Sequence, residues 1–306
     1  MRIKAIGVFT VLVLGLMATP AQASAWPGDS AIRTADGSNV FGKNLSGLSF
    51  ESANTLWAVK NSPATLYRLT PSGSAWQIAQ SRALSFADGQ GDPDAEGVVS
   101  TPDGLFVVSE RDNDDEDVSA PTVLKYGTQS TAEQQWALPG MPETDPNEGP
   151  EGIAWVPDTF LTAQSFKDDT GKLYNPADYA NHGSGLVAVG LEATGEIYLY
   201  ALQSTAKLIA KFASGQKQVM ELEFDGTRLW ATCDDHCGGR ATTFTISGGK
   251  FKLTNTYDRP SKLPNLNLEG FAISPSCING KRTAIWSDDD NTDKHALRSG
   301  TLDCPA

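Results

Sequence analysis

Five segments of the chain repeat one pattern: a short apolar strand with an acidic or polar residue in one of its first two positions. In four of the five, glycine is the second residue. A second short strand, rich in β-branched and aromatic residues, is expected soon after each. Repetition at intervals of about 50 residues is the signature of a β-propeller, in which every repeat forms one four-stranded blade. The first strands are expected at 46–50, 96–100, 151–155, 220–224 and 269–273, and the second strands at 56–59, 105–108, 160–163, 229–232 and 283–286.

This repetition predicts an all-β fold, a β-propeller of five blades, with six blades as the alternative. A β-sandwich is the rival architecture, but it does not explain five similar units. The first repeat shows all four strands, with the outer two at 65–69 and 75–79. The last repeat lacks a fourth strand, and residues 32–41 are expected to supply it and so close the ring. An insertion at 167–185, rich in Asp, Asn, Gly and Tyr, is expected to be a loop that forms a lid or a wall of a site.

The N-terminal residues have the pattern of a secretory signal peptide. Arg2 and Lys4 precede an apolar stretch at 5–17, and small residues around position 23 form the expected cleavage site. The apolar stretch is shorter than the roughly 18 residues that a membrane-spanning helix needs. We therefore expect residues 1–25 to be a signal peptide, residues 26–306 to form a single propeller domain, and the protein to be extracellular or periplasmic.

The chain carries 37 acidic and 24 basic residues, which give a formal net charge of −13 at pH 7. This charge repels nucleic-acid phosphates and anionic membrane surfaces, so neither nucleic acid nor a membrane is expected as a partner. The same charge suits cation binding and solubility. We expect a monomer that acts on a small-molecule or extracellular substrate of unidentified class.

The chain has four cysteines, Cys233, Cys237, Cys277 and Cys304. An even number in an exported chain predicts two disulfides, out of the three pairings that four cysteines allow. We favour a Cys233–Cys237 disulfide that closes a local loop and a Cys277–Cys304 disulfide that links the two ends of the last repeat. The alternative is a metal site, since His236 lies between Cys233 and Cys237. Zinc sites need about four ligands at characteristic spacing, and the sequence has no second such pair.

Acidic residues recur at two places in the repeat, the start of the first strand and the end of the second. Strands joined by a hairpin are antiparallel, so these two places lie side by side. Both sets of acids are therefore expected around one mouth of the central channel. The alternative is that they are solvated or accept hydrogen bonds from backbone amides. The expected set comprises Glu96, Glu151, Glu221 and Glu269 on first strands and Glu110, Asp234 and Asp288 at the ends of second strands.

Carboxylates without basic neighbours repel one another, and a hard cation relieves that repulsion. Calcium takes about six to eight oxygen ligands, so these acids predict a calcium site, with Asn61 and backbone carbonyls completing the shell. Two acidic runs, at 112–117 and 288–293, lack the Gly and Glu of an EF-hand loop and are expected to be solvated. The sequence has no Gly-x-Ser-x-Gly elbow. His295, which follows the acidic run of the last repeat, is the histidine expected to reach the channel mouth.

The repeat units that begin at Ser46, Glu96 and Glu269 resemble the phytase-like propellers, a family described by the esterase-like activity of phytase. The resemblance rests on the recurrent Glu-Gly strand start and on the Ser-Glu or Ser-Asp-Asp that ends the second strand, and it covers most of the chain. It implies calcium ions at one mouth, flanked by basic residues, that bind phosphate and activate water. The positions that match this pattern are Glu96, Glu110, Glu151, Glu221, Asp234, Glu269 and Asp288.

This chain departs from the family pattern, since Lys60, Arg111 and Arg240 are the only obvious basic residues near those acids. Two functions are therefore expected as alternatives. The first is a secreted, calcium-dependent ester or phosphoester hydrolase, in which Glu110 or Glu269 acts as the base and His295 is a further catalytic candidate. The second is a non-catalytic binding or scaffold propeller with structural calcium. The presence of a cluster of basic groups opposite the acids would distinguish the hydrolase from the scaffold. Hydrolysis of anionic esters needs such a cluster, and a structural ion does not.

Overall fold

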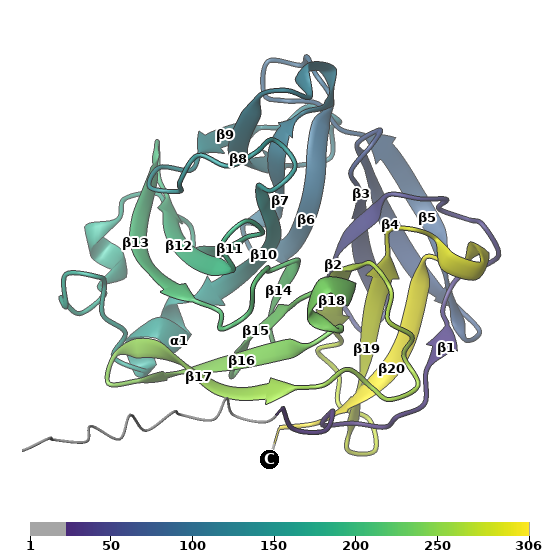
Figure 1. Cartoon of the computed structure of the whole chain (residues 1–306). Coiled ribbons are helices and arrows are strands. Elements are labelled where there is room, and N and C mark those ends of the chain that lie inside the picture. Colours follow the sequence, from purple (N-terminus) through teal and green to yellow (C-terminus); the bar gives the residue numbers. More distant parts are fainter. Residues whose placement is uncertain (1–22, 306) are drawn as a thin grey trace, which may run out of the picture.

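The computed structural model describes residues 23–305, which form five four-stranded antiparallel sheets around a central axis (Figure 1). In four of the sheets the chain starts at the innermost strand and runs outward, so consecutive strands are hydrogen-bonded neighbours, and in the fifth the outermost strand comes from the N-terminal segment. The five innermost strands contact one another in turn around the axis. The predicted five-bladed β-propeller is therefore confirmed, and the six-bladed and sandwich alternatives are wrong.

The strands divide evenly among the blades. Blades 1 and 2 comprise β2 (Leu45–Ser52), β3 (Thr55–Lys60), β4 (Thr65–Ser72) and β5 (Ala75–Ala83), then β6 (Pro93–Thr101), β7 (Gly104–Asp112), β8 (Ser119–Tyr126) and β9 (Gln134–Ala137). Blades 3 and 4 comprise β10 (Pro150–Pro157), β11 (Gly185–Leu191), β12 (Glu196–Leu202) and β13 (Ala206–Ala213), then β14 (Glu221–Phe224), β15 (Leu229–Thr232), β16 (Ala241–Ser247) and β17 (Lys250–Tyr257). Blade 5 comprises β18 (Leu268–Ile273), β19 (Lys281–Asp288), β20 (Leu297–Asp303) and β1 (Arg33–Thr34). The helices are α1 (Asp158–Ala163) and four short 3-10 turns, η1 (Asn113–Asp115), η2 (Pro176–Asp178), η3 (Asp235–Cys237) and η4 (Thr292–Lys294).

The ring is closed by the N-terminal segment. Strand β1 pairs antiparallel with β20, with Arg33 opposite Ser299 (Figure 1). The indole N–H of Trp26 also donates to the carbonyl of Thr301 at 2.8 Å. The prediction that residues 32–41 supply the missing outer strand is confirmed, and β1 covers the outer edge of β20 at Arg33 and Thr34.

Glycine lets neighbouring innermost strands approach each other closely. A Cβ atom on Gly97 of blade 2 would lie 2.5 Å from the carbonyl oxygen of Glu151 in blade 3. One on Gly152 of blade 3 would lie 2.6 Å from backbone atoms of Glu221 in blade 4. Contacts under 3 Å do not occur for real Cβ atoms, so these positions accept only glycine without a shift of backbone. The recurrent glycine in the repeat thus sets the spacing of the blades.

One predicted strand is wrong. Residues 160–163 belong to helix α1, and the second strand of blade 3 is β11, which follows a long insertion. The physical reason is that the insertion begins directly after β10 and moves the hairpin partner of β10 some twenty-five residues along the chain. The apolar run at 160–163 packs instead against the inner strands of blades 3 and 4, where Phe160 meets Phe224 of β14 with ring centroids 4.8 Å apart.

The insertion lies at the channel end opposite the predicted acidic mouth, because it leaves the last residue of an innermost strand. A polar cluster holds it together: the Tyr174 hydroxyl donates to Asp158 at 2.7 Å, and Nε2 of His182 lies 3.1 Å from the same carboxylate. Ser184 N–H and hydroxyl both donate to Asp103 in the turn between β6 and β7. The insertion is therefore not a lid over the acids, and residues 167–185 do not line the pocket at either end of the channel. It packs instead on the outer part of blades 3 and 4, where the N–H of Asp169 donates to the Ile209 carbonyl at 3.0 Å and that of Lys167 to the Gly249 carbonyl at 2.8 Å.

Both predicted disulfides, Cys233–Cys237 and Cys277–Cys304, are confirmed. Their formation rules out the zinc alternative, since disulfide sulfurs are not thiolate ligands. Two disulfides are compatible with an extracellular or periplasmic protein. Within the described residues no helix combines the length and apolar character needed to cross a membrane. The predicted signal peptide at 1–25 falls almost wholly on residues 1–22, which lie outside the described residues.

Replacing Gly97 by Ala should destabilise the fold, because the new methyl group meets backbone of the next blade. We expect a loss of about 2–3 kcal/mol in the free energy of unfolding, as for overpacked cores. Urea denaturation measures it. The control is Gly37→Ala, whose methyl group would approach only the exposed side chain of Val40. Equal stabilities of the two variants would contradict this account of blade spacing.

Candidate metal centre

A cavity of about 220 Å³ opens at the mouth of the channel where the innermost strands begin. Six carboxylates and three side-chain amides face it, and Met220 is the apolar residue among those that line it. The lining residues are Asn61, Glu96, Glu110, Arg111, Asn147, Glu151, Glu192, Met220, Asp234, His236, Asn267 and Glu269. We call this space the acidic cavity.

The hairpin geometry of the blades explains why these side chains meet. Glu96, Glu151 and Glu269 stand near the starts of β6, β10 and β18. Glu110 lies near the end of β7, and Asp234 follows β15. Antiparallel pairing brings strand starts and hairpin-partner ends to the same end of each sheet. The structure therefore gathers five of the seven predicted ligands around one cavity.

Glu221 is placed differently. It is fully buried deeper in the channel, and its carboxylate accepts hydrogen bonds from three backbone N–H groups. The donors are Leu48 at 3.1 Å, Ile153 at 3.2 Å and Leu222 at 2.8 Å, from blades 1, 3 and 4. Glu221 thus ties three innermost strands together across the channel and does not line the acidic cavity.

Asp288 and His295 also lie away from the acidic cavity. The Asp288 carboxylate accepts from the N–H of Thr292 at 2.9 Å and lies 3.5 Å from the Arg298 guanidinium. Nδ1 of His295 lies 3.0 Å from the buried carboxylate of Asp36. Both side chains hold the η4 turn and the N-terminal segment against blade 5.

Buried oxygen atoms in the acidic cavity lack hydrogen-bond partners. These are Oε2 of Glu151, Oε2 of Glu269 and Oδ1 of Asn61. The Glu151 side chain is 5% exposed, so water does not readily replace the missing partners. Buried polar atoms in folded proteins are nearly always paired, and an unpaired set that faces one space is a site for an ion or ligand.

Burial and mutual repulsion raise the pKa values of the cavity carboxyls. Burial is the main cause at Glu96 and Glu151, whose pKa values are raised well above the ordinary range, and neighbouring carboxylates add to it. Burial likewise raises the pKa of Glu110 to about 8, with Asp94 adding to the shift. The ionised forms of these groups are therefore disfavoured until positive charge enters the cavity.

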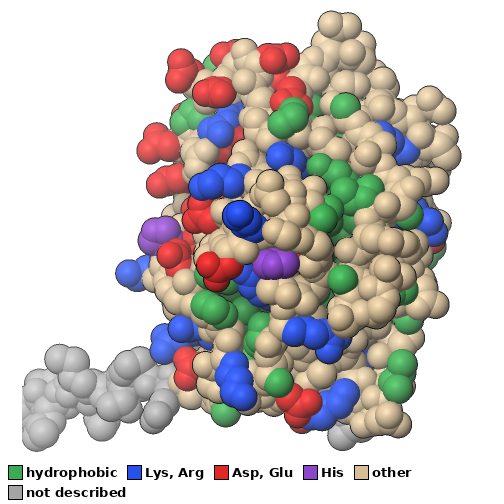
Figure 2. All heavy atoms as spheres, turned by 90° about the vertical axis from the view of Figure 1, so that its right-hand side faces the viewer, with side chains coloured by type: hydrophobic (Ala, Val, Ile, Leu, Met, Phe, Trp, Pro, Cys, Tyr) green, Lys and Arg blue, Asp and Glu red, His purple; other side chains and the backbone are tan. Residues whose placement is uncertain are grey.

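The basic side chains on the cavity do little to neutralise it. Nε of Arg111 lies 2.7 Å from Asp94, and its other nitrogens donate to the Pro146 carbonyl and the Asn147 amide oxygen. His236 is exposed, and hydrogen bonding to Asp234 raises its pKa. The cluster of basic groups that would face the acids in a site for highly anionic esters is thus not among the lining residues. Acidic side chains also gather toward one edge of the surface seen in Figure 2.

Two acidic residues of the site escaped the sequence analysis. Asp94 precedes Glu96 by two residues on β6, where shifts of register on both sides of Ala95 mark a β-bulge. Oxygen atoms of Asp94, Glu96 and Glu110 lie within 4.8 Å of one another. Glu192 directly follows β11 and corresponds in the repeat to Glu110, but the wrong second strand in blade 3 concealed that correspondence. Correct placement of β11 would have revealed it.

The donor set fits a hard divalent cation. Carboxylate and amide oxygens are the ligands that calcium prefers, in a shell of about six to eight. Among the lining residues, only the thioether of Met220 and the imidazole of His236 are softer ligands than oxygen. A cation here would pair with the unpartnered oxygens and permit the buried carboxyls to ionise.

Comparison with known proteins places part of the chain in a family. Residues 41–222 match the model of a protein family described as Phytase-like: Esterase-like activity of phytase. No curated protein matches the chain.

Solved structures that are similar share little sequence with the chain. A protein of unknown function from Bacteroides caccae is 11% identical, with a TM-score of 0.45, over 86% of this chain and 83% of that one. The allergen Mala s 1 from Malassezia sympodialis is 10% identical, with a TM-score of 0.45, over 89% of this chain and 82% of that one. The PQQ-bound aldose sugar dehydrogenase from Streptomyces coelicolor is 10% identical, with a TM-score of 0.41, over 90% of this chain and 100% of that one.

The metal-free protein should lose stability as the pH rises. Carboxyls with raised pKa values keep protons in the native state that the unfolded chain has already released. The free energy of unfolding therefore falls as the pH rises from about 4.5 to about 8. Urea denaturation in EDTA at several pH values measures the slope. Glu110→Gln should flatten it, whereas Asp114→Asn, on the exposed acidic loop, should not. A metal-free stability that rises over this range would contradict the assignment.

Proposed function

The chain belongs to the phytase-like family described by the esterase-like activity of phytase, and on that basis we propose that it is an exported, calcium-dependent hydrolase of ester or phosphoester bonds. One observation carries the proposal: the unpartnered, buried oxygens of Glu151, Glu269 and Asn61 face one cavity in a protein with net negative charge. Export is supported by the signal-peptide pattern at 1–25 and by the two disulfides.

The cavity residues would divide into two roles. Glu151, Glu269 and the amide oxygen of Asn61 would hold calcium, since each has a buried oxygen without a hydrogen-bond partner, and the buried Glu96 would join them. When bound, calcium supplies Lewis acidity toward a substrate oxygen and toward water. Glu110 is the candidate base, because its Oε2 is oriented by the N–H of Gly149 at 2.8 Å. A carboxyl whose pKa of about 8 falls when positive charge is near can accept a proton at neutral pH.

The charge of the cavity bears on the substrate. Arg111 is already paired with Asp94, so little positive charge remains to bind several phosphate groups at once. A carboxylic ester or a phosphodiester places less negative charge beside the acids than a phosphomonoester does. The proposed substrates are therefore esters of low negative charge.

A second candidate function is a non-catalytic propeller with structural calcium. The same Arg111–Asp94 pairing favours it, because the basic groups that anionic esters need are not displayed. Glu221 shows that a carboxylate in this channel can serve structure alone, since it accepts from its own strand and from the innermost strands of blades 1 and 3.

Calcium should stabilise the protein. It binds the folded form and not the unfolded chain, so a concentration of about 100 times the dissociation constant adds about 2.7 kcal/mol to the free energy of unfolding. Differential scanning calorimetry of EDTA-treated protein, with and without calcium, measures the change. Glu151→Gln should weaken the effect, and the charge-matched control Asp114→Asn should retain it. An unchanged melting temperature on adding calcium would contradict the calcium site on which both candidate functions depend.

Turnover separates the two candidate functions. We expect calcium-dependent hydrolysis of p-nitrophenyl butyrate or bis(p-nitrophenyl) phosphate, faster than that of p-nitrophenyl phosphate. Glu110→Gln should lower kcat by about 10²-fold or more, as for loss of a general base, while its calcium-induced thermal shift remains measurable. Calcium binding with no turnover of any of the three would favour the structural alternative.

A further inference from the structure

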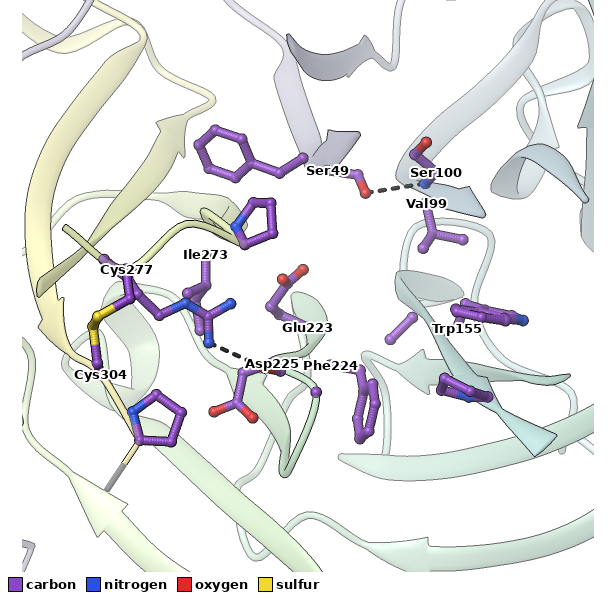
Figure 3. Close-up of a pocket in the computed structure, with 17 residues that line it drawn as sticks. Ser49, Val99, Ser100, Trp155, Glu223, Phe224, Asp225, Ile273, Cys277 and Cys304 are labelled. Carbon is purple, nitrogen blue, oxygen red and sulfur yellow. Dashed lines mark hydrogen bonds between the residues drawn. A yellow bond between two sulfur atoms is a disulfide. The ribbon is translucent and has the colours of Figure 1, made fainter. Parts of the chain in front are cut away.

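A second, larger pocket of about 550 Å³ lies at the other end of the channel, where the innermost strands end (Figure 3). All five innermost strands contribute to it, and its walls are mainly apolar and aromatic. The side chains that matter here are Phe50, Val99, Trp155, Glu223, Phe224 and Ile273. We call it the opposite pocket, and its size falls in the range of about 300–1,000 Å³ typical of small-molecule sites.

The opposite pocket is separate from the acidic cavity. Glu221 and Glu223 are two residues apart on β14, so strand alternation points both toward the channel. The carboxylate of Glu221 is held by backbone N–H groups of three blades and blocks the space between the two ends. The two sites have no lining residue in common.

Glu223 is the polar group that reaches into the middle of this apolar space. Figure 3 shows its carboxyl pointing between Ile273 and Val99, with the ring of Trp155 on the far wall. Burial raises its pKa to about 8, against the opposing effects of the Arg282 guanidinium and the Ile273 N–H. The protein thus provides too little positive charge here to favour the carboxylate.

The other charged groups at the opposite pocket are already engaged. Arg282 donates through Nε to the Ser274 carbonyl and through Nη1 to the Asp225 carbonyl at 3.0 Å. The Asp225 carboxylate accepts from Thr227, from Arg228 and from the indole N–H of Trp230. Glu223 is therefore the lining carboxyl left without a side-chain partner.

We propose that the opposite pocket binds a small primary amine with an aromatic or aliphatic body, whose ammonium group pairs with Glu223. The ammonium supplies the charge that this carboxylate lacks, in a hydrogen-bonded ion pair sheltered from solvent. The rings of Trp155 and Phe224 cover the body of the ligand and attract its positive end. A carboxylate ligand of the same shape is disfavoured, because it brings no positive charge to Glu223 and places its own negative charge near the Asp225 carboxylate.

Three probes of one shape test this inference: phenethylamine, 2-phenylethanol and 3-phenylpropionate. Isothermal titration calorimetry in EDTA at neutral pH keeps the result independent of calcium and of the proposed hydrolase. The amine should bind at least about tenfold more tightly than the alcohol, because its hydrogen bond is charge-assisted. The acid should bind most weakly.

Variants locate the binding. Glu223→Gln should weaken amine binding about tenfold and leave the alcohol within about twofold, and the retained alcohol binding shows that the pocket is still folded. The charge-matched control Glu51→Gln, on the exposed end of β2, should bind both probes as the natural protein does. Equal affinity for amine and alcohol, an unchanged affinity in Glu223→Gln, or amine binding that Glu151→Gln abolishes would each overturn the inference.

Discussion

The innermost strands of this propeller meet backbone to backbone, and that close approach determines what the channel can contain. At Gly97 and Gly152 a Cβ atom would collide with the main chain of the next blade. Strands that pack so closely leave a narrow channel, in which the side chain beside each glycine has little room except along the axis. Blade 4 has Glu221 where the other blades have glycine, and its carboxylate turns inward to accept hydrogen bonds from backbone amides.

The same narrowness gives the two ends of the channel their different chemistry. At one end, strand starts and hairpin-partner ends bring six carboxylates around about 220 Å³, and burial makes their ionisation costly. At the other end, apolar and aromatic side chains surround the carboxyl of Glu223, whereas the second lining carboxylate, Asp225, is already paired. In both places the protein provides too little positive charge to stabilise an ionised carboxylate. A bound cation would supply that charge. A metal ion suits the first site, whose donors are many and hard, and an organic ammonium suits the second.

Much of this fold could be predicted because the repeat encodes local features, namely strand alternation, hairpin pairing and the Glu-Gly strand start. These placed all five innermost strands, four of the five second strands and the closing strand at the N-terminus. Prediction failed in blade 3, where the apolar run at 160–163 has the pattern of a strand but belongs to α1. Because the true second strand, β11, was not recognised, Glu192 at its end was missed. It also could not distinguish Glu221 from Glu151. Glu221 holds the second position of its repeat, where the other four have glycine, and Met220 holds the position of Glu151. Contacts between blades then give the Glu221 carboxylate backbone donors and leave Oε2 of Glu151 without a partner.

Anomalous diffraction from crystals soaked in a calcium-mimicking lanthanide tests the central claim, that the acidic cavity is a cation site, without reference to activity. The account predicts a strong peak in the acidic cavity at about 2.3–2.6 Å from the free carboxylate oxygens of Glu151 and Glu269. Density for the cavity side chains should show little movement, because the carboxylates already converge. A cavity without a peak, or peaks confined to exposed acids such as Asp114 and Asp115, would contradict it.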